Sequence, residues 1–323
     1  MNSREKILQI LLDKDGVSAK ALRDILGISK QRVHKILKEL IADKRIFKIG
    51  SPPRVLYYIS DPVIKNELDI DEETKEQLQE NFILISPKGD LLEGVEAFSA
   101  WCEGRNLPIK KTIDEYKKTQ TKYIRHVNKD GLIDGIQKLK NTKELSLCVD
   151  QQFYVDFYAI ERFGKTKLGT LMHFGKMSQS KKLIKMIINI SKPKLEKAIQ
   201  MLKVDAIAYV PPSLKRDIQI MRELENGFHI SLPIIKLEKI KGDIIIPQKA
   251  LPKIKDRIEN ARNSITVNDN RNFKRVLLID DALGSGATIN EVACKLKKRK
   301  IASKVFGFAI TGSYKGFEVI SEA

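Results

Sequence analysis

VLLIDDALGSGAT, residues 276–288, is the stretch that decides how the second half of this chain folds. Its first four residues are all apolar, as in a strand buried on both faces of a parallel sheet. Asp280 and Asp281 follow at once, then a loop of small residues, then a helical pattern over residues 289–297. The order of strand, acidic pair, small-residue loop and helix predicts an α/β domain with a parallel sheet flanked by helices.

The loop has the composition of an anion cradle. It ends at a predicted helix N-terminus, where free N–H groups and the helix dipole favour a phosphate. Gly284 and Gly286 let the backbone approach the anion closely. Ser285 and Thr288 add hydroxyl donors. Two carboxylates just before such a cradle suit the vicinal hydroxyls of a ribose, or a hydrated magnesium ion.

Other phosphate motifs fit this segment less well. A Walker loop requires a Lys after its last glycine, and this chain has none there. A dinucleotide fingerprint requires a third glycine, where this chain has Ile289. A phosphoacceptor site would explain the acidic pair but not the loop after it. A capped helix without any ligand is the remaining alternative.

Residues 276–288 resemble the phosphoribosyl-pyrophosphate-binding motif of type I phosphoribosyltransferases: four apolar residues, an acidic pair, and a loop ending in Gly-x-Thr. Three upstream segments are similar to ComF-like members of that family. They are the early helical region at 168–176 and 181–188, a strand at 206–210 with the Pro-Pro loop 211–216, and residues 247–262 with Gln248, Leu251, Arg257 and Asn260. The resemblance covers residues 150–315 and implies a type I phosphoribosyltransferase fold for residues 144–323.

The resemblance also implies a role for each segment. Asp280 and Asp281 would bind the ribose hydroxyls and magnesium at the catalytic centre. The ribose 5-phosphate would be held by Gly284, Ser285, Gly286, Ala287 and Thr288. Pyrophosphate, with magnesium, would be held by Pro212, Ser213, Lys215 and Arg216. A mobile segment would close over the site with Lys249, Lys253 or Arg257.

The implied chemistry is displacement of pyrophosphate from the anomeric carbon by a nitrogen nucleophile. Its oxocarbenium-like transition state needs cations and a metal ion around the leaving group rather than a covalent nucleophile. The scattered histidines are therefore interpreted as structural or nucleic-acid-facing: His34, His126, His173 and His229.

Residues 1–60 contain three helical patterns. In the first, residues 7–12 supply an apolar face that includes Leu12. Ser18 is the predicted N-cap of the second helix and Gly27 its end, with Ala21, Leu22 and Ile25 facing inward. In the third, the apolar positions Val33, Ile36, Leu37, Leu40 and Ile41 form one stripe. The opposite face carries Lys30, Gln31, Arg32, His34, Lys35 and Lys38, which can reach phosphates and base edges in a major groove.

Two short β-type runs follow the third helix, at residues 45–49 and 55–59, joined by the turn 50–54. This order of helices and hairpin resembles the winged helix-turn-helix family of DNA-binding domains. Some winged helices serve only protein contacts or dimerisation, and that alternative stays open.

The distribution of charge along the chain also indicates a boundary near residue 60. The chain carries 59 Lys and Arg against 41 Asp and Glu, a net charge of +18, which attracts a polyanion; general solubility is the alternative reading. Residues 1–60 are basic, residues 61–80 acidic, and residues 105–143 basic again. We therefore expect a winged helix at 1–60 and an acidic linker with a basic helical connector at 61–143. Tyr116, Tyr123, Arg125 and His126 of the connector could stack on single-stranded nucleic acid, although a solvated helix face is the default.

Composition excludes several classes. The apolar share of 42% is that of a globular chain, and no apolar run is long enough to span a bilayer. The start has no signal-peptide pattern. Cys102, Cys148 and Cys294 are isolated, which suggests neither a disulfide framework nor zinc and favours a reducing, cytoplasmic location.

Three functions remain. The fusion is similar to the phosphoribosyltransferase-like effectors of some retron antiphage systems, whose partners would be a reverse transcriptase and its DNA–RNA hybrid. Alternatively, as in Gram-positive purine repressors, the chain is a transcription regulator that senses phosphoribosyl pyrophosphate or a nucleotide without catalysis. ComF-like DNA uptake or nucleotide salvage is the third. The departures from the family are the missing cysteine-rich zinc segment and an unrecognisable acceptor hood. Both parent families commonly dimerise, so a homodimer is expected.

Overall fold

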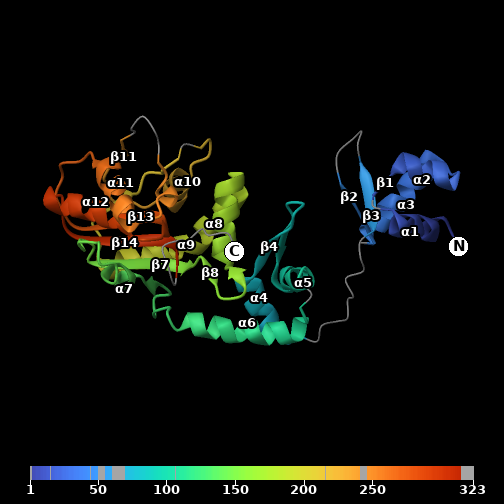
Figure 1. Cartoon of the computed structure of the whole chain (residues 1–323), viewed down its shortest axis with the longest axis horizontal. Coiled ribbons are helices and arrows are strands. Elements are labelled where there is room, and N and C mark those ends of the chain that lie inside the picture. Colours follow the sequence, from blue (N-terminus) through green and yellow to red (C-terminus); the bar gives the residue numbers. More distant parts are fainter. Residues whose placement is uncertain are drawn as a thin grey trace. The chain divides into compact units, whose positions relative to one another are not determined.

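The computed structural model describes residues 2–14, 16–43, 45–49, 55–59, 70–105, 107–214, 216–240 and 246–313. The predicted turn at residues 50–54, residues 61–69 of the acidic stretch 61–80, and Lys215 lie outside these ranges. The chain divides into two compact units, Met1–Asp69 and Ile70–Ala323 (Figure 1). Residues 70–143, expected to form part of a connector, are therefore part of the second unit.

The first unit packs three helices on a small sheet. Its elements are α1 (Ser3–Asp13), β1 (Val17–Ser18), α2 (Ala19–Leu26), α3 (Lys30–Ala42), β2 (Ile46–Ile49) and β3 (Leu56–Ile59). The strands pair antiparallel in the order β1-β3-β2. The predicted limits of α2 are confirmed: Ser18 Oγ accepts from the Ala21 N–H, and Gly27 ends the helix at a φ of 65°.

Periodicity predicted the core of this unit with two errors. Val33, Leu37 and Leu40 of α3 are buried together with Ile7, Leu11 and Leu22. Leu12 and Ile25, expected on the inner faces of their helices, are instead 59% and 50% exposed. The apolar stripes of these two helices are thus one residue narrower than their sequences suggest.

The second unit is built on a five-stranded sheet in the order β10-β13-β14-β7-β6. Its strands are β6 (Ile133–Asp134), β7 (Gln151–Phe157), β10 (Ala206–Tyr209), β13 (Phe273–Leu283) and β14 (Ala302–Gly312). The four longer strands run parallel, and β6 is antiparallel to β7. The predicted mixed α/β architecture with a mostly parallel sheet is confirmed at this level.

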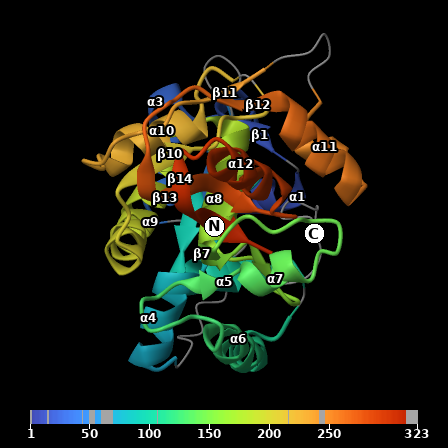
Figure 2. The same cartoon turned by 90° about the vertical axis from the view of Figure 1, so that its left-hand side faces the viewer.

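Helices cover both faces of this sheet (Figure 2). One face packs on α8 (Lys167–Ser178), α9 (Lys181–Leu202) and α10 (Ile220–Phe228), which share a core with Leu277 and Ile279 of β13. The other face packs on α12 (Ala287–Lys298), which is itself covered by α11 (Ile254–Ser264). An antiparallel pair, β11 (Leu237–Lys239) and β12 (Ile265–Val267), lies beside α11 and α12.

Residues 70–143 add smaller elements to the second unit. These are α4 (Glu72–Asn81), β4 (Ile83–Ile85), β5 (Leu91–Glu93), α5 (Gly94–Glu103), α6 (Ile109–Ile124) and α7 (Ile136–Lys140). Two short strands, β8 (Ala159–Ile160) and β9 (Gly164–Lys165), precede α8. None of the helices in the described ranges combines the length and apolar character that crossing a membrane requires.

The aromatic residues of α6 do not face solvent. Tyr116 is 3% exposed and lies edge-on against Phe82 and Phe163, and Tyr123 is 5% exposed against Phe157. The proposal that these tyrosines stack on single-stranded nucleic acid is therefore wrong. They are core residues, and the exposed lysines of α6, Lys110, Lys111, Lys118 and Lys122, lie on its solvent face.

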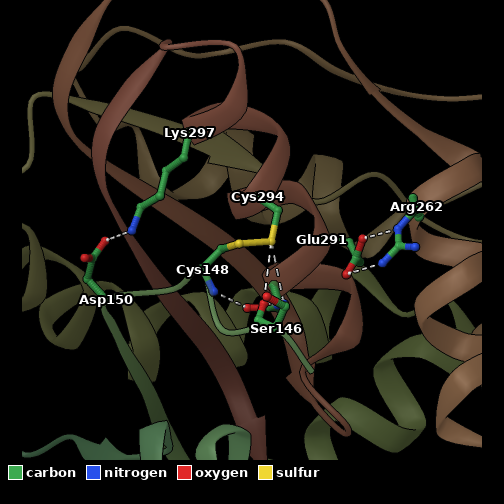
Figure 3. The surroundings of a disulfide bond; sticks show 8 residues. Ser146, Cys148, Asp150, Arg262, Glu291, Cys294 and Lys297 are labelled. Atoms are coloured by element: carbon green, nitrogen blue, oxygen red, sulfur yellow. Dashed lines mark hydrogen bonds and ion pairs between the residues drawn. A yellow bond between two sulfur atoms is a disulfide. The ribbon is translucent and has the colours of Figure 1, made fainter. Parts of the chain in front are cut away.

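The interpretation of the cysteines as isolated is also wrong. Cys148 and Cys294 form a disulfide with their Cα atoms 5.1 Å apart (Figure 3). The bond links the segment before β7 to α12. Asn290 reinforces it, because its side chain accepts from the Cys148 N–H and donates to the Ser146 carbonyl oxygen. Lys297 adds an ion pair to Asp150 at 2.8 Å. Asn290, Cys294 and Lys297 thus form one face of α12 that holds this segment.

Candidate functional site

A cavity of about 360 Å³ opens at the carboxyl edge of the parallel sheet. Strands β10 and β13 pair in parallel, with Tyr209 opposite Ile279, so the segments that leave these two strands meet at this edge. The cavity is lined by Pro212, Ser213, Arg216, Asp280, Asp281 and residues 284–288. Two segments that lie about 70 positions apart in the sequence, and that both contain predicted site residues, therefore line the same cavity.

The acidic pair lies within β13 rather than after it. The strand continues to Leu283, so the predicted end at residue 279 is too early. The Asp281 N–H donates to the Asp280 carboxylate at 2.8 Å. Lys176, at the end of α8, forms an ion pair with Asp281 at 2.7 Å. The carboxylates thus already have one cation at the cavity wall.

Burial raises the pKa of Asp280 to about 7, and the negative charge of Asp281 adds to this rise. The Asp281 N–H and the ammonium of Lys176 act in the opposite direction. Because the folded-state pKa lies above that of an exposed carboxyl, folding retains a proton between about pH 4 and pH 7 that the unfolded chain has lost. Ionised Asp280 therefore lowers the free energy of unfolding above pH 7.

We expect Asp280→Asn to stabilise the ligand-free protein at pH 8 and to have little effect at pH 4. A shift of three pKa units would correspond to about 4 kcal/mol, and partial exposure of the carboxyl reduces this to about 1–3 kcal/mol. Urea unfolding at both pH values measures the difference. Equal effects of the substitution at pH 4 and pH 8 would contradict the assignment.

The loop after β13 reaches α12 through a glycine that no other residue replaces easily. Gly286 has a φ of 75°, and a Cβ atom there would lie 2.8 Å from Leu139. Ser285 Oγ accepts from the Ala287 N–H at 3.4 Å. The first N–H groups of a helix have no acceptor within it, so the start of α12 provides donors for an anion at the cavity wall.

The loop after β10 forms a second wall. Pro212 and Ser213 line the cavity directly. Arg216 also lines it, and its guanidinium donates to the Lys176 carbonyl oxygen at 2.7 Å. This contact ties the loop to the C-terminal end of α8, which carries the lysine that pairs with Asp281.

A third wall of the cavity comes from β11, the segment before α11, and α11. Lys239, Gln248, Arg257 and Ser264 line it. Burial lowers the pKa of Lys239. Arg257 is 7% exposed and donates to the Leu251 carbonyl oxygen. Ser264 Oγ is buried and has no hydrogen-bond partner within the described residues.

The acidic pair and both loops, predicted from the sequence, line the cavity together with Lys176, Lys239 and Ser264, which sequence reasoning did not name as site residues. Of the three cations expected to close over the site, Arg257 lines the cavity, whereas Lys253 does not. The side chain of Lys249 lies outside the described parts of the structure. Lys176 is 104 positions before Asp280, and no local pattern connects the two.

Asp280 and Asp281 alone do not form a complete metal site. No cluster of three His, Cys, Asp or Glu side chains occurs in the ranges that the structure describes. Magnesium commonly binds through one or two carboxylates and completes its coordination with substrate phosphates and water. The pair therefore fits magnesium that arrives together with a phosphorylated ligand.

The first unit presents a separate polar surface on α3. Lys30, Gln31, Arg32, His34, Lys35 and Lys38 are all exposed, opposite the buried Val33, Leu37 and Leu40. Ser29 caps the helix by accepting from the Arg32 N–H. Strands β2 and β3 follow as an antiparallel hairpin with Ile49 opposite Leu56.

Residues 2–46 match the winged helix-turn-helix DNA-binding family. The first unit therefore carries a winged helix, with α3 in the position of the helix that enters the major groove. The rest of the chain lies outside this match. No curated protein matches the chain.

We expect Arg32→Ala with Lys35→Ala to weaken duplex binding by the winged helix and to flatten its salt dependence. Each lost phosphate contact lowers the slope of log affinity against log salt by about one. Fluorescence anisotropy from 50 to 200 mM salt measures it. Lys6→Ala with Lys14→Ala removes the same charge from exposed positions outside α3 and is the control. An unchanged slope in the first variant would show that α3 does not face the duplex.

Proposed function

We propose that this chain is a nucleic-acid-associated protein that binds phosphoribosyl pyrophosphate with magnesium at the carboxyl edge of its parallel sheet. The observation that carries the proposal is the acidic pair on β13, placed in one cavity with a helix N-terminus and the loop after β10. This ligand offers vicinal hydroxyls between two phosphorylated ends. The cavity offers the matching groups: a carboxylate pair for the hydroxyls, and two loops that would bind the phosphate and the pyrophosphate.

The charge of the cavity supports the same ligand. Lys176, Arg216, Lys239 and Arg257 line it, against the two carboxylates. Four cations suit a ligand with a phosphate and a pyrophosphate, since buried anions need paired charges or hydrogen bonds. Gly286 lets the chain turn into α12 beside Leu139, and the free N–H groups at the start of α12 would bind the 5-phosphate. Pro212, Ser213 and Arg216 would hold the pyrophosphate.

Transfer would proceed by breaking the bond from the anomeric carbon to pyrophosphate and forming one to a nitrogen, whose proton leaves. Magnesium would supply charge neutralisation of the leaving group. Arg216 and the N–H group of Ser213 would stabilise the developing charge on pyrophosphate. The wall with Lys239, Gln248 and Ser264 would be available to an acceptor.

Calorimetric titration with phosphoribosyl pyrophosphate in the presence of magnesium tests the proposal. We expect one site per chain and a loss of heat when magnesium is chelated. Ribose 5-phosphate should bind more weakly because it lacks the pyrophosphate. Absence of binding to the full chain, with and without duplex DNA, would overturn the proposal.

The winged helix favours a second candidate, in which the same ligand regulates DNA binding without transfer. A ligand-dependent change in duplex affinity, with no pyrophosphate released for any nitrogen acceptor, would identify this sensor. Pyrophosphate release would instead identify the enzyme. In the enzyme case we propose a role as effector of a retron-type system, in which the DNA–RNA hybrid is the nucleic-acid partner.

A further inference from the structure

We propose that the solvent-exposed face of α9 is a second nucleic-acid surface, which binds the phosphodiester backbone of duplex DNA without reading its sequence. This α9 lysine surface consists of Lys181, Lys182, Lys185, Lys192, Lys197 and, at the end of the helix, Lys203. It lies in the second unit and is distinct from both the winged helix and the cavity. Figure 2 shows α9 on the outside of the sheet beside α10.

These lysines share one side of the helix. The buried side contains Leu183, Ile184, Ile187, Leu195, Ala198 and Leu202. At 100° per residue the six lysines lie away from this side, and all but the half-buried Lys192 are exposed. The helix has 22 residues and is about 33 Å long, close to the roughly 34 Å of one DNA turn.

The charges on this surface are not neutralised by the protein. Within the described residues, only Lys192 of the six has an acidic partner, Glu196, at a long 3.9 Å. The basic end of α12 is different, because Lys295 donates to backbone carbonyls and Lys297 pairs with Asp150. The α9 lysines are therefore available to an external polyanion, whereas Lys295 and Lys297 of α12 hold neighbouring segments in place.

The charges in the first turn of α9 are the opposite of those that stabilise a helix N-terminus, where acidic residues are favourable. This turn contains no acidic residue, and Lys181 and Lys182 stand at the positive end of the helix dipole. Such cations destabilise a helix in isolation. A phosphate backbone would reverse this effect, because the dipole and the lysines then attract the same charge.

Among polyanions, duplex DNA fits this surface best. A lipid surface binds helices that insert an apolar face, and that face of α9 is buried in the core. Protein interfaces are depleted of lysine. A lysine acts as a point charge on a phosphate, and contacts to phosphates carry no sequence information. DNA is also the ligand class of the winged helix in the same chain.

The test measures salt dependence with the full chain and a duplex of scrambled sequence. We expect Lys181→Gln, Lys182→Gln, Lys185→Gln and Lys192→Gln together to lower the slope of log affinity against log salt by about 2–4. Lys129→Gln, Lys140→Gln, Lys143→Gln and Lys304→Gln remove the same charge elsewhere and should lower it by less than one. Adding Arg32→Ala and Lys35→Ala should lower the slope further and additively.

Two further measurements make the proposal falsifiable. Lys181→Glu with Lys182→Glu should raise the midpoint of thermal unfolding while it weakens DNA binding, so that loss of binding cannot be attributed to misfolding. An unchanged slope in the α9 variant, or an equal loss in the control, would overturn the proposal. It would also be overturned if the α9 variant lost binding to phosphatidylserine vesicles but kept its DNA affinity.

Discussion

Asp280→Asn with Asp281→Asn should weaken binding of phosphoribosyl pyrophosphate by about 100-fold or more and leave the fold intact. Each carboxylate would accept charge-assisted hydrogen bonds from ribose hydroxyls, and such bonds contribute about 1.5–3 kcal/mol each. Every 1.4 kcal/mol corresponds to about tenfold in affinity. The substitution keeps the shape of both side chains, so β13 and its parallel neighbours should remain paired. Calorimetry measures affinity, and circular dichroism measures the fold.

The control for this variant is Asp114→Asn with Asp130→Asn, which removes the same charge from positions that do not line the cavity. Its affinity should stay within about twofold of the wild type, since the remaining charges act at a distance through solvent. Retained affinity in the Asp280/Asp281 variant would mean that the ligand binds elsewhere. Equal loss in both variants would mean that net charge, rather than contact, governs binding.

Loss of the disulfide should lower the free energy of unfolding by about 2–4 kcal/mol. The bond joins residues 146 positions apart, and a cross-link over a long loop restricts the unfolded chain strongly. The native segment should stay in place, because Asn290 and Lys297 hold it independently of the sulfur atoms. Urea unfolding with and without dithiothreitol measures the difference.

Comparing the stabilities of the two single variants and the double variant shows whether the disulfide alone accounts for the loss. Cys148→Ser, Cys294→Ser and the double variant should all lose the same stability, since each removes one and the same bond. Dithiothreitol should destabilise the wild type and leave the three variants unchanged. A wild type insensitive to the reductant, or a double variant less stable than both singles, would show that the two cysteines contribute separately.

Local chemistry made part of this structure predictable. Ser18 and Gly27 delimit α2 because capping depends on residues within one turn of the helix end. The acidic pair and Gly286 were identifiable because an anion cradle needs particular residues at adjacent positions. The two segments of the cavity were assigned to one site only by the family resemblance. They meet because both follow parallel strands, whose carboxyl ends lie at one edge of a sheet.

What could not be predicted depends on distant contacts. Tyr116 looked like a surface aromatic among lysines, yet its partner Phe163 is 47 positions away. Cys148 and Cys294 show no spacing pattern, because the fold rather than the sequence brings them together. Lys176 is part of a helix with no phosphate motif of its own. Residue type alone does not indicate that it meets Asp281.

In the ion pair of Lys176 with Asp281, the protein's own ammonium group takes the place that a bound cation would have beside this carboxylate. Any metal ion that binds this carboxylate must compete with the ammonium group, so ligand entry is an exchange of cations. Exchange of this kind makes selectivity depend on charge density: a monovalent ion gains little by replacing a lysine, whereas a divalent ion gains more. Replacing Lys176 with a neutral side chain would therefore make the pocket less discriminating among cations.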